Sequence, residues 1–141
     1  MAVKINGNGS FVPDDGLVDW ITGTSANGMS AGEKAVYKTA GGNYEICDGS
    51  ELSIKDFAGI TDGAAVAVGG SVRLMPPGGR IAPLTAAFGA GVTSLWAKQD
   101  GSLAVFTGVG TGNYTRQVAT CSETGGNAII VGGCGPVLYK S

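Results

Sequence analysis

Residues 95–106, LWAKQDGSLAVF, contain the strongest short-range folding signal in the chain. Asp100-Gly101 lies near their centre, and Asp-Gly is favoured in two-residue hairpin turns because both central residues of the commonest type adopt positive φ. The stretch therefore predicts two antiparallel strands joined at this dipeptide. Apolar side chains for the two strands lie on both sides of the turn, at Leu95, Trp96, Leu103, Val105 and Phe106.

Similar patterns recur along the chain. Residues 43–54, NYEICDGSELSI, place two short alternating runs around Asp48-Gly49 and predict a second hairpin. Two more pairs of runs flank glycine-rich turns, at residues 76–79 in SVRLMPPGGRIAPL and at residues 132–133 in NAIIVGGCGPVLYK. Short strands repeated every 8–12 residues or so are typical of an all-β sandwich or barrel.

Glycine content supports this fold class. The chain has 26 glycines among 141 residues, well above the usual share of about 7%. Its longest glycine-free run, residues 113–124, is about as long as one average helix, which disfavours a helical bundle. The length corresponds to one domain. We therefore expect an all-β, single-domain, jelly-roll-like sandwich or small barrel of short antiparallel strands over residues 33–141.

Residues 1–32 have a different character, because turn-forming residues dominate them. We expect an extended N-terminal arm, rich in Gly, Asn and Ser. A long ordered loop packed on its own domain is the alternative. Apolar side chains in a polar arm need a surface to cover them, so the candidate anchors for a protein partner are Phe11, Val12, Trp20 and Ile21.

One motif suggests an enzyme. Gly28-Met29-Ser30-Ala31-Gly32 matches G-x-S-x-G, the nucleophile elbow of serine hydrolases. The chain contains no histidine, and histidine is the base that activates the serine in those enzymes. The alternating residues after the motif resemble a strand, whereas the elbow leads into a helix. We expect no catalytic residues, and we interpret the pentapeptide as a flexible joint between arm and domain.

Charge and cysteine content exclude further classes. Eleven acidic and nine basic residues give a net charge of −2, with no basic cluster for nucleic acid. No segment has the length and hydropathy of a membrane span, and residues 1–10 lack a signal-peptide pattern, so we expect synthesis in a cytoplasm. Without histidine or a C-x-x-C pair, we expect no metal and no cofactor. Buried, reduced thiols are expected at Cys47, Cys121 and Cys134.

The middle of the chain has a recognisable pattern. FAGITDGAAVAVGGSVRLMPPGGRIAPL, residues 57–84, together with GVTSLWAKQDGSLAVF, residues 91–106, resembles the capsid cement, or decoration, proteins of tailed bacteriophages. Gly59-Ile60, Ala64-Ala65 and Gly69-Gly70-Ser71-Val72 match the first segment of the family pattern. The second segment is matched by Gly91-Val92 and Asp100-Gly101.

The resemblance implies a non-enzymatic structural protein, made in the cytoplasm of a host bacterium and located on the outer capsid surface of the virion. It would stabilise joints between subunits of the major capsid protein, its main partner, and would form a symmetric homodimer or homotrimer. The alternative is a carbohydrate- or receptor-binding β-domain of a head fibre or tail, with Trp20, Trp96 or a tyrosine as the platform for a sugar.

Overall fold

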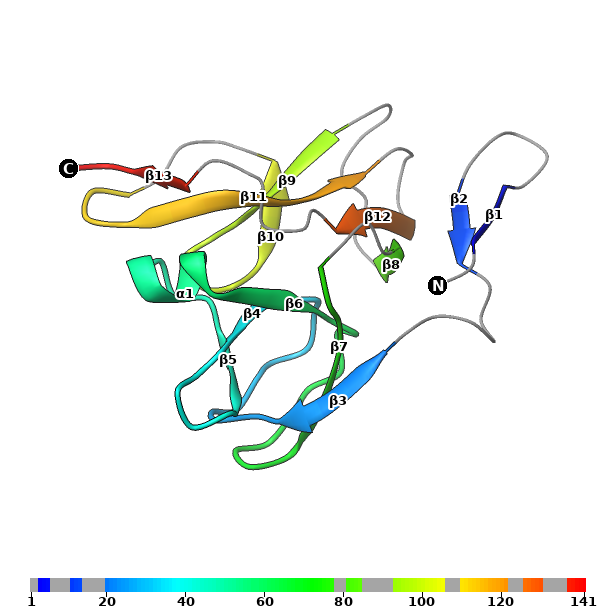
Figure 1. Cartoon of the computed structure of the whole chain (residues 1–141), viewed down its shortest axis with the longest axis horizontal. Helices are drawn as coiled ribbons and strands as arrows, with labels where there is room; N and C mark the ends of the chain where they lie inside the picture. Colours follow the sequence, from blue (N-terminus) through cyan, green and yellow to red (C-terminus); the bar gives the residue numbers. More distant parts are fainter. Residues whose placement is uncertain are drawn as a thin grey trace.

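The computed structural model describes the backbone of residues 3–5, 11–13, 20–77, 81–84, 93–105, 110–121, 126–130 and 137–141. Side chains are described for residues 20–77, 94–105, 110–120 and 137–141. Over these ranges the chain is all-β, as predicted, with one short helix, α1 (Glu51–Lys55). Two antiparallel sheets lie one above the other in Figure 1.

The five-stranded sheet forms the lower layer in Figure 1. The segment after its first strand also meets its last strand, since Ser25 and Tyr44 form a β-bridge in which the Ala26 N–H donates to the Tyr44 carbonyl at 2.8 Å. The sheet is therefore curled towards a small barrel. Its strands, in spatial order, are β3 (Ile21–Thr24), β7 (Ser71–Met75), β6 (Phe57–Thr61), β4 (Ala35–Lys38) and β5 (Tyr44–Ile46).

The six-stranded sheet forms the upper layer. Its strands run in the order β10 (Leu103–Val105), β9 (Thr93–Ala97), β11 (Tyr114–Cys121), β12 (Gly126–Ile130) and β8 (Ile81–Leu84), and β13 (Val137–Tyr139) pairs with the start of β11. The predicted hairpin at Asp100-Gly101 is confirmed, because β9 and β10 pair with Leu103 opposite Ala97. Its turn is longer than the two-residue type, because the Lys98 N–H donates to the Ser102 carbonyl at 2.9 Å and Asp100 does not adopt positive φ. Separately, β1 (Val3–Ile5) pairs with β2 (Phe11–Pro13).

Two other predicted hairpins have the right strands and the wrong partners. Strands β7 and β8, on either side of residues 76–79, belong to different sheets. Strands β12 and β13, on either side of residues 132–133, both pair with β11 rather than with each other. Turn residues specify that a chain changes direction, whereas the burial of each strand's apolar face selects its neighbour.

The main core lies between the two sheets, because alternate residues of each strand point towards the other sheet. In β9, Leu95 and Ala97 are fully buried, whereas Trp96 between them points to the other side and is half-buried. The remaining buried members come from both layers: Ala35, Tyr37, Cys47, Ile54, Phe57, Ile60, Met75, Val118 and Ala119.

A second apolar cluster fills the inside of the curled sheet. It consists of Met29, Val36, Tyr44, Val72 and Leu74. Gly23 of β3 lies against the Tyr44 ring, and a Cβ at this position would come within 2.3 Å of a ring carbon. Strand β4 is therefore buried on both faces, because Ala35 and Tyr37 belong to the main core and Val36 to the second cluster.

The expected arm of residues 1–32 ends earlier than predicted. Residues 21–24 form β3 and pair with β7 in the sheet. Met29 is buried, and its N–H and carbonyl both bond to Val66, at 2.8 and 2.9 Å. The interpretation of the G-x-S-x-G segment as a flexible joint is thus wrong, because two-way bonding and a buried side chain hold it against residues 63–66. Residues 21–32 therefore belong to the folded domain rather than to an arm.

The predicted hairpin at Asp48-Gly49 is also wrong, because its second half is helix α1. Ser50 caps the helix: its Oγ accepts a hydrogen bond from the Ser53 N–H at 3.3 Å. Glu51 begins the helix and Lys55 ends it, which matches the sign of the helix dipole at each end. These capping and charge signals are visible in the sequence and distinguish the segment from a strand.

Candidate interaction surface around helix α1

Helix α1 is fixed at one end of the molecule between the two sheets (Figure 1). Ile54 and Ser53 are its buried residues, and the Ser53 Oγ donates to the Ser50 carbonyl at 3.0 Å. Leu52 points outward and is 62% exposed. A five-residue helix is too short to be stable alone, so these contacts with the body of the protein hold it.

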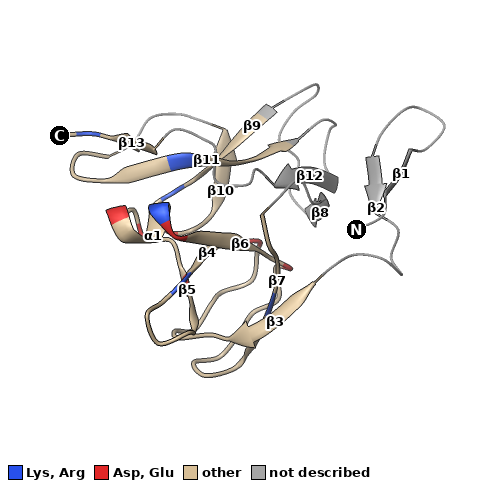
Figure 2. Cartoon of the chain, viewed as in Figure 1, with Lys and Arg blue, Asp and Glu red and all other residues tan. Residues whose placement is uncertain are grey.

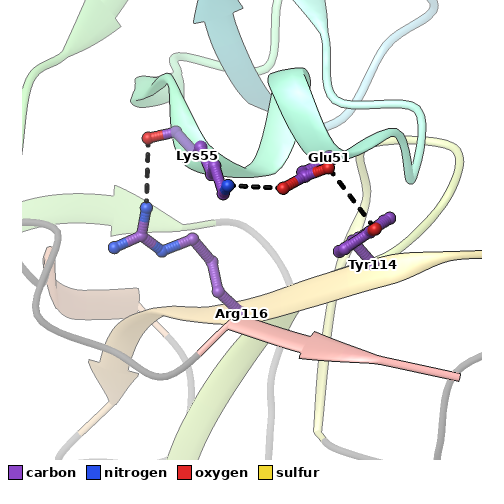
Figure 3. Close-up of polar contacts among 4 residues, drawn as sticks. All are labelled: Glu51, Lys55, Tyr114 and Arg116. Atoms are coloured by element: carbon purple, nitrogen blue, oxygen red, sulfur yellow. Dashed lines mark hydrogen bonds and ion pairs between the residues drawn. The ribbon is translucent and has the colours of Figure 1, made fainter.

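Arg116 of β11 connects the helix to the six-stranded sheet. Its side chain is buried, and Nη1 donates to the Ile54 carbonyl at 3.0 Å and to the Lys55 carbonyl at 3.3 Å. The bond to Lys55 is drawn in Figure 3. The last carbonyls of a helix lack partners within it, so the guanidinium both satisfies them and holds the helix end. Its Nε is buried and has no hydrogen-bond partner among the described groups.

The first helical residue connects to the same strand. The Tyr114 hydroxyl donates to Glu51 Oε2 at 3.4 Å, and Lys55 Nζ forms an ion pair with Glu51 Oε1 (Figure 3). The hydrogen bond from Lys55 lowers the pKa of Glu51, and the hydrogen bond to Glu51 raises the pKa of Lys55. Burial of the ring, and after it the Glu51 charge, raises the pKa of Tyr114. At neutral pH all three groups keep their ordinary charge.

Strand β13 extends this surface. Tyr139 lies opposite Tyr114 in the ladder, and their rings stack with centroids 4.4 Å apart and an interplanar angle of 29°. Tyr139 is 53% exposed and Val137, on the same face of β13, is 37% exposed. We define the tyrosine surface as Glu51, Leu52, Lys55, Tyr114, Val137 and Tyr139. Figure 2 shows both charge signs on α1 and otherwise scattered charges over the described elements.

The tyrosine surface was not predicted from the sequence. The alternation in PVLYK does place Val137 and Tyr139 on one face of a strand. Pairing of β13 with the start of β11, which brings Tyr139 to Tyr114, joins residues 25 positions apart in the chain. No local signal specifies that pairing.

The predicted anchors lie elsewhere. Phe11 and Val12 belong to β2, and their side chains lie outside the described residues. Trp20 is half-buried against the main core, and the Arg73 guanidinium carbon lies 4.6 Å from its ring centroid. Arg73 Nε also bonds to Asp62 Oδ2 at 3.1 Å. Ile21, the first residue of β3, is 37% exposed. A role for these four residues in binding stays a prediction.

Cys47 is a fully buried thiol beneath α1. Its Sγ donates to the Ser53 carbonyl at 3.4 Å, and burial raises its pKa to about 12. The group is therefore a neutral thiol at physiological pH, which makes it a small apolar side chain rather than a nucleophile. The prediction of a buried, reduced thiol is confirmed for Cys47. The side chains of Cys121 and Cys134 lie outside the described residues.

Comparison of the chain with known protein families, with curated proteins and with solved structures gives no match. Within the described part of the chain, no three His, Cys, Asp or Glu side chains gather as ligands for a metal ion. The only described helix is α1, and no described helix has the length and apolar character needed to cross a membrane.

Proposed function

We propose that this chain is a non-enzymatic structural protein that binds other protein subunits through the tyrosine surface. The observation that carries the proposal is the stacked pair of a half-buried Tyr114 and an exposed Tyr139, together with the exposed apolar side chains of Val137 on the same strand as Tyr139 and of Leu52 on α1. Tyrosine is enriched at protein interfaces because it offers a large apolar ring together with a polar hydroxyl.

Rigidity of the surface supports this role. Arg116 holds one end of α1, and the Glu51–Tyr114 bond holds the other. Side chains that are ordered before binding lose less conformational entropy when a partner arrives. A small surface of this kind therefore binds more tightly than a flexible segment of the same composition.

The partner we propose is the major capsid protein of a tailed bacteriophage, and the location is the outside of an assembled head. This part of the proposal rests on the resemblance of residues 57–84 and 91–106 to capsid cement proteins. The stabilising effects of a cement protein add up over its many copies. Each copy links neighbouring shell subunits, and together the copies raise the resistance of the shell to rupture.

The experiment is co-sedimentation of the purified chain with empty shells assembled from a tailed-bacteriophage major capsid protein of the same genome. Leu52→Asp places a charge in the proposed interface and should weaken binding at least tenfold. Val68→Asp is the matched control, because Val68 is 74% exposed and lies in the segment between β6 and β7. Equal binding by the two variants would exclude the tyrosine surface as the docking site.

A second experiment separates the arm from this surface. Deletion of residues 2–19 leaves β3 intact, whereas a deletion through residue 24 would remove a strand of the sheet. If Phe11 and Val12 are anchors, the short deletion lowers shell binding without lowering the melting temperature of the domain.

Binding of the full chain to immobilised glycans, with none to shells, would instead support the carbohydrate-binding alternative. Glycan binding without shell binding would contradict docking through the tyrosine surface and docking through the arm alike.

A further inference from the structure

Strand β13 has one free edge among the described strands. It pairs with β11 on one side only, with Tyr139 opposite Tyr114 and Val137 opposite Arg116. Its Val137 and Tyr139 side chains are exposed, and the strand itself carries no charged residue. Folded proteins often protect such an edge by keeping it short or by lysine, proline or a bulge, because its free backbone groups pair readily with another chain. Pro136 and Lys140 flank β13 in the sequence, so the unprotected stretch consists of its three residues, Val137, Leu138 and Tyr139.

The hydrogen-bond pattern shows which backbone groups are free. Lys140 directs both groups to the β11 side, since its N–H donates to the Asn113 carbonyl at 3.3 Å and its carbonyl accepts from the Gly112 N–H at 2.7 Å. Backbone groups of successive strand residues point in alternate directions. The N–H and carbonyl of Tyr139 and of Val137 therefore point away from β11, towards the outer edge.

The opposite strand agrees with this assignment. The Tyr114 N–H donates to the Gly49 carbonyl at 2.8 Å, on the side away from β13. Tyr114 and Tyr139 are thus a pair that exchanges no backbone bonds, and the side chains of such pairs lie closest together. Their stacked rings are the expected result.

We propose that the free edge of β13 binds the same edge of a second copy of this chain, antiparallel and around a two-fold axis at Leu138. In this register Val137 of each copy lies opposite Tyr139 of the other. Each of these pairs exchanges two backbone hydrogen bonds, so four bonds cross the interface. Each pair also sets a β-branched side chain against an aromatic ring, a favourable cross-strand combination.

The edge is self-complementary, which points to a second copy rather than to an unrelated strand. A two-fold interface requires a surface that fits itself, and the outward donors and acceptors of Val137 and Tyr139 meet this condition. Charge does not oppose it, because in this register the two Lys140 residues lie at opposite ends of the interface, and the neighbouring helix carries one acid and one base, Glu51 and Lys55. The result is one continuous sheet formed by the six-stranded sheets of the two copies.

Dimerisation does not depend on the proposed function, although it would strengthen it. A dimer presents two tyrosine surfaces on one body, and two linked contacts bind a shell more tightly than either alone. The two proposals fail separately. Loss of shell binding in Leu52→Asp with an intact dimer tests the first, and the association state of the isolated chain tests the second.

The test is sedimentation equilibrium of the isolated chain from about 1 μM to about 500 μM, the range in which small interfaces associate. Val137→Pro removes an outward N–H together with the β-branched side chain, and proline is tolerated on a free edge. Two of the four crossing bonds are lost, and the dimer should dissociate at least tenfold more readily. Val137→Thr keeps the N–H and the branched shape, and it should retain the dimer.

A covalent readout checks the register. Directly opposed residues that exchange no backbone bonds lie about 4.5 Å apart between Cα atoms, a distance that a disulfide spans. Leu138→Cys should therefore form a disulfide-linked dimer under mild oxidation, well above the background from the three native cysteines of the parent chain. A monomer at all concentrations, a trimer, or equal dimers in the proline and threonine variants would each overturn the proposal.

Discussion

Two turns of this molecule share the sequence Asp-Gly-Ser but continue into different secondary structure. Residues 48–50 lead into helix α1, and residues 100–102 lead into strand β10. Locally the turns are alike. The aspartate Oδ1 accepts from the serine N–H at 3.0 Å in both, and the glycine φ is 84° at Gly49 and 79° at Gly101. Three residues of identical sequence therefore specify the same turn and leave the next element open.

Local signals after the serine account for part of the difference. Ser50 caps α1, and Glu51 and Lys55 form an ion pair in the favourable order along a helix. Ser102 instead bonds to Asp100 and precedes Leu103, Ala104 and Val105. Such a run forms a strand when a neighbouring strand is present.

Tertiary contacts account for the rest, and they link the two turns to opposite sheets. The Gly49 carbonyl accepts from the Tyr114 N–H of the six-stranded sheet at 2.8 Å. The Gly101 carbonyl accepts from the Ala35 N–H of the five-stranded sheet at 2.7 Å. The turn at Asp48 follows a strand of the five-stranded sheet and bonds to the six-stranded sheet, whereas the turn at Asp100 joins strands of the six-stranded sheet and bonds to the five-stranded sheet. A turn sequence therefore sets the direction of the chain, and packing selects the element after it.

The largest expected effect comes from adding a methyl group at Gly101. A Cβ there would lie 2.0 Å from Ile46 Cγ2 and 3.3 Å from the Ala35 carbonyl oxygen. Gly101→Ala should lower the free energy of unfolding by about 3 kcal/mol, from the positive φ and the overlap together. Chemical denaturation measures it.

The other turn supplies the comparison, and an open site supplies the control. At Gly49 a Cβ would meet Asn113 Oδ1 at 2.7 Å and Gln99 Cγ at 3.1 Å, both in side chains that can move. At Gly112 it meets nothing within 4 Å, although φ is +82°. The expected order of destabilisation is Gly101→Ala, Gly49→Ala, Gly112→Ala. Equal losses would show that backbone conformation alone sets the cost.

The second effect concerns the helix alone. Arg116→Met removes the two bonds to the carbonyls of Ile54 and Lys55 and should cost about 2 kcal/mol. Hydrogen exchange should become faster at the Asp56 amide, which bonds to the Leu52 carbonyl at 2.9 Å in α1. The Gly101 amide of the other turn is the internal control. Uniform acceleration at both sites would mean that Arg116 stabilises the whole domain rather than the helix.

The third effect tests the two serines. Ser50→Ala removes the helix cap and should cost about 1 kcal/mol. Ser102→Ala removes only a hydroxyl bond to Asp100 at the surface and should change stability by less than about 0.5 kcal/mol. Thermal unfolding of both variants measures the difference. A larger loss at Ser102 would contradict the assignment of Ser50 as the residue that selects helix.

The smallest effect is a response to acid. Burial opposes ionisation of Asp48, yet bonds from Ser50 and Ser53 lower its pKa, and bonds from Ser102 lower the pKa of Asp100. Because both pKa values lie below the unfolded value, their stabilisation is present above the ordinary aspartate pKa and is lost as pH falls through the folded values.

Nuclear magnetic resonance titration of the two carboxyl groups checks this result. Ser102→Ala should raise the pKa of Asp100 more than Ser50→Ala raises the pKa of Asp48, because Ser53 still bonds to Asp48. Equal shifts would mean that the shared turn, rather than the serine hydroxyls, sets both values.

Much of the architecture came from residue patterns that act over short distances. Glycine-rich turns and alternating runs predicted an all-β domain, and Asp100-Gly101 predicted the β9–β10 hairpin. Absence of histidine is a property of the chain and argues against the serine-hydrolase interpretation of Ser30. Ser50, Glu51 and Lys55 also carried enough information to predict α1, although the alternating pattern around Asp48-Gly49 favoured a strand.

Tertiary structure decided what those patterns left open. Only the fold separates β7 from β8, adds β3 to the five-stranded sheet, pairs Met29 with Val66, and brings Tyr139 against Tyr114. The physical reason is the distance along the sequence over which each signal acts. Capping, turn geometry and side-chain alternation depend on neighbours a few residues away. Strand partners depend on which apolar faces bury one another, and that is a property of the assembled core.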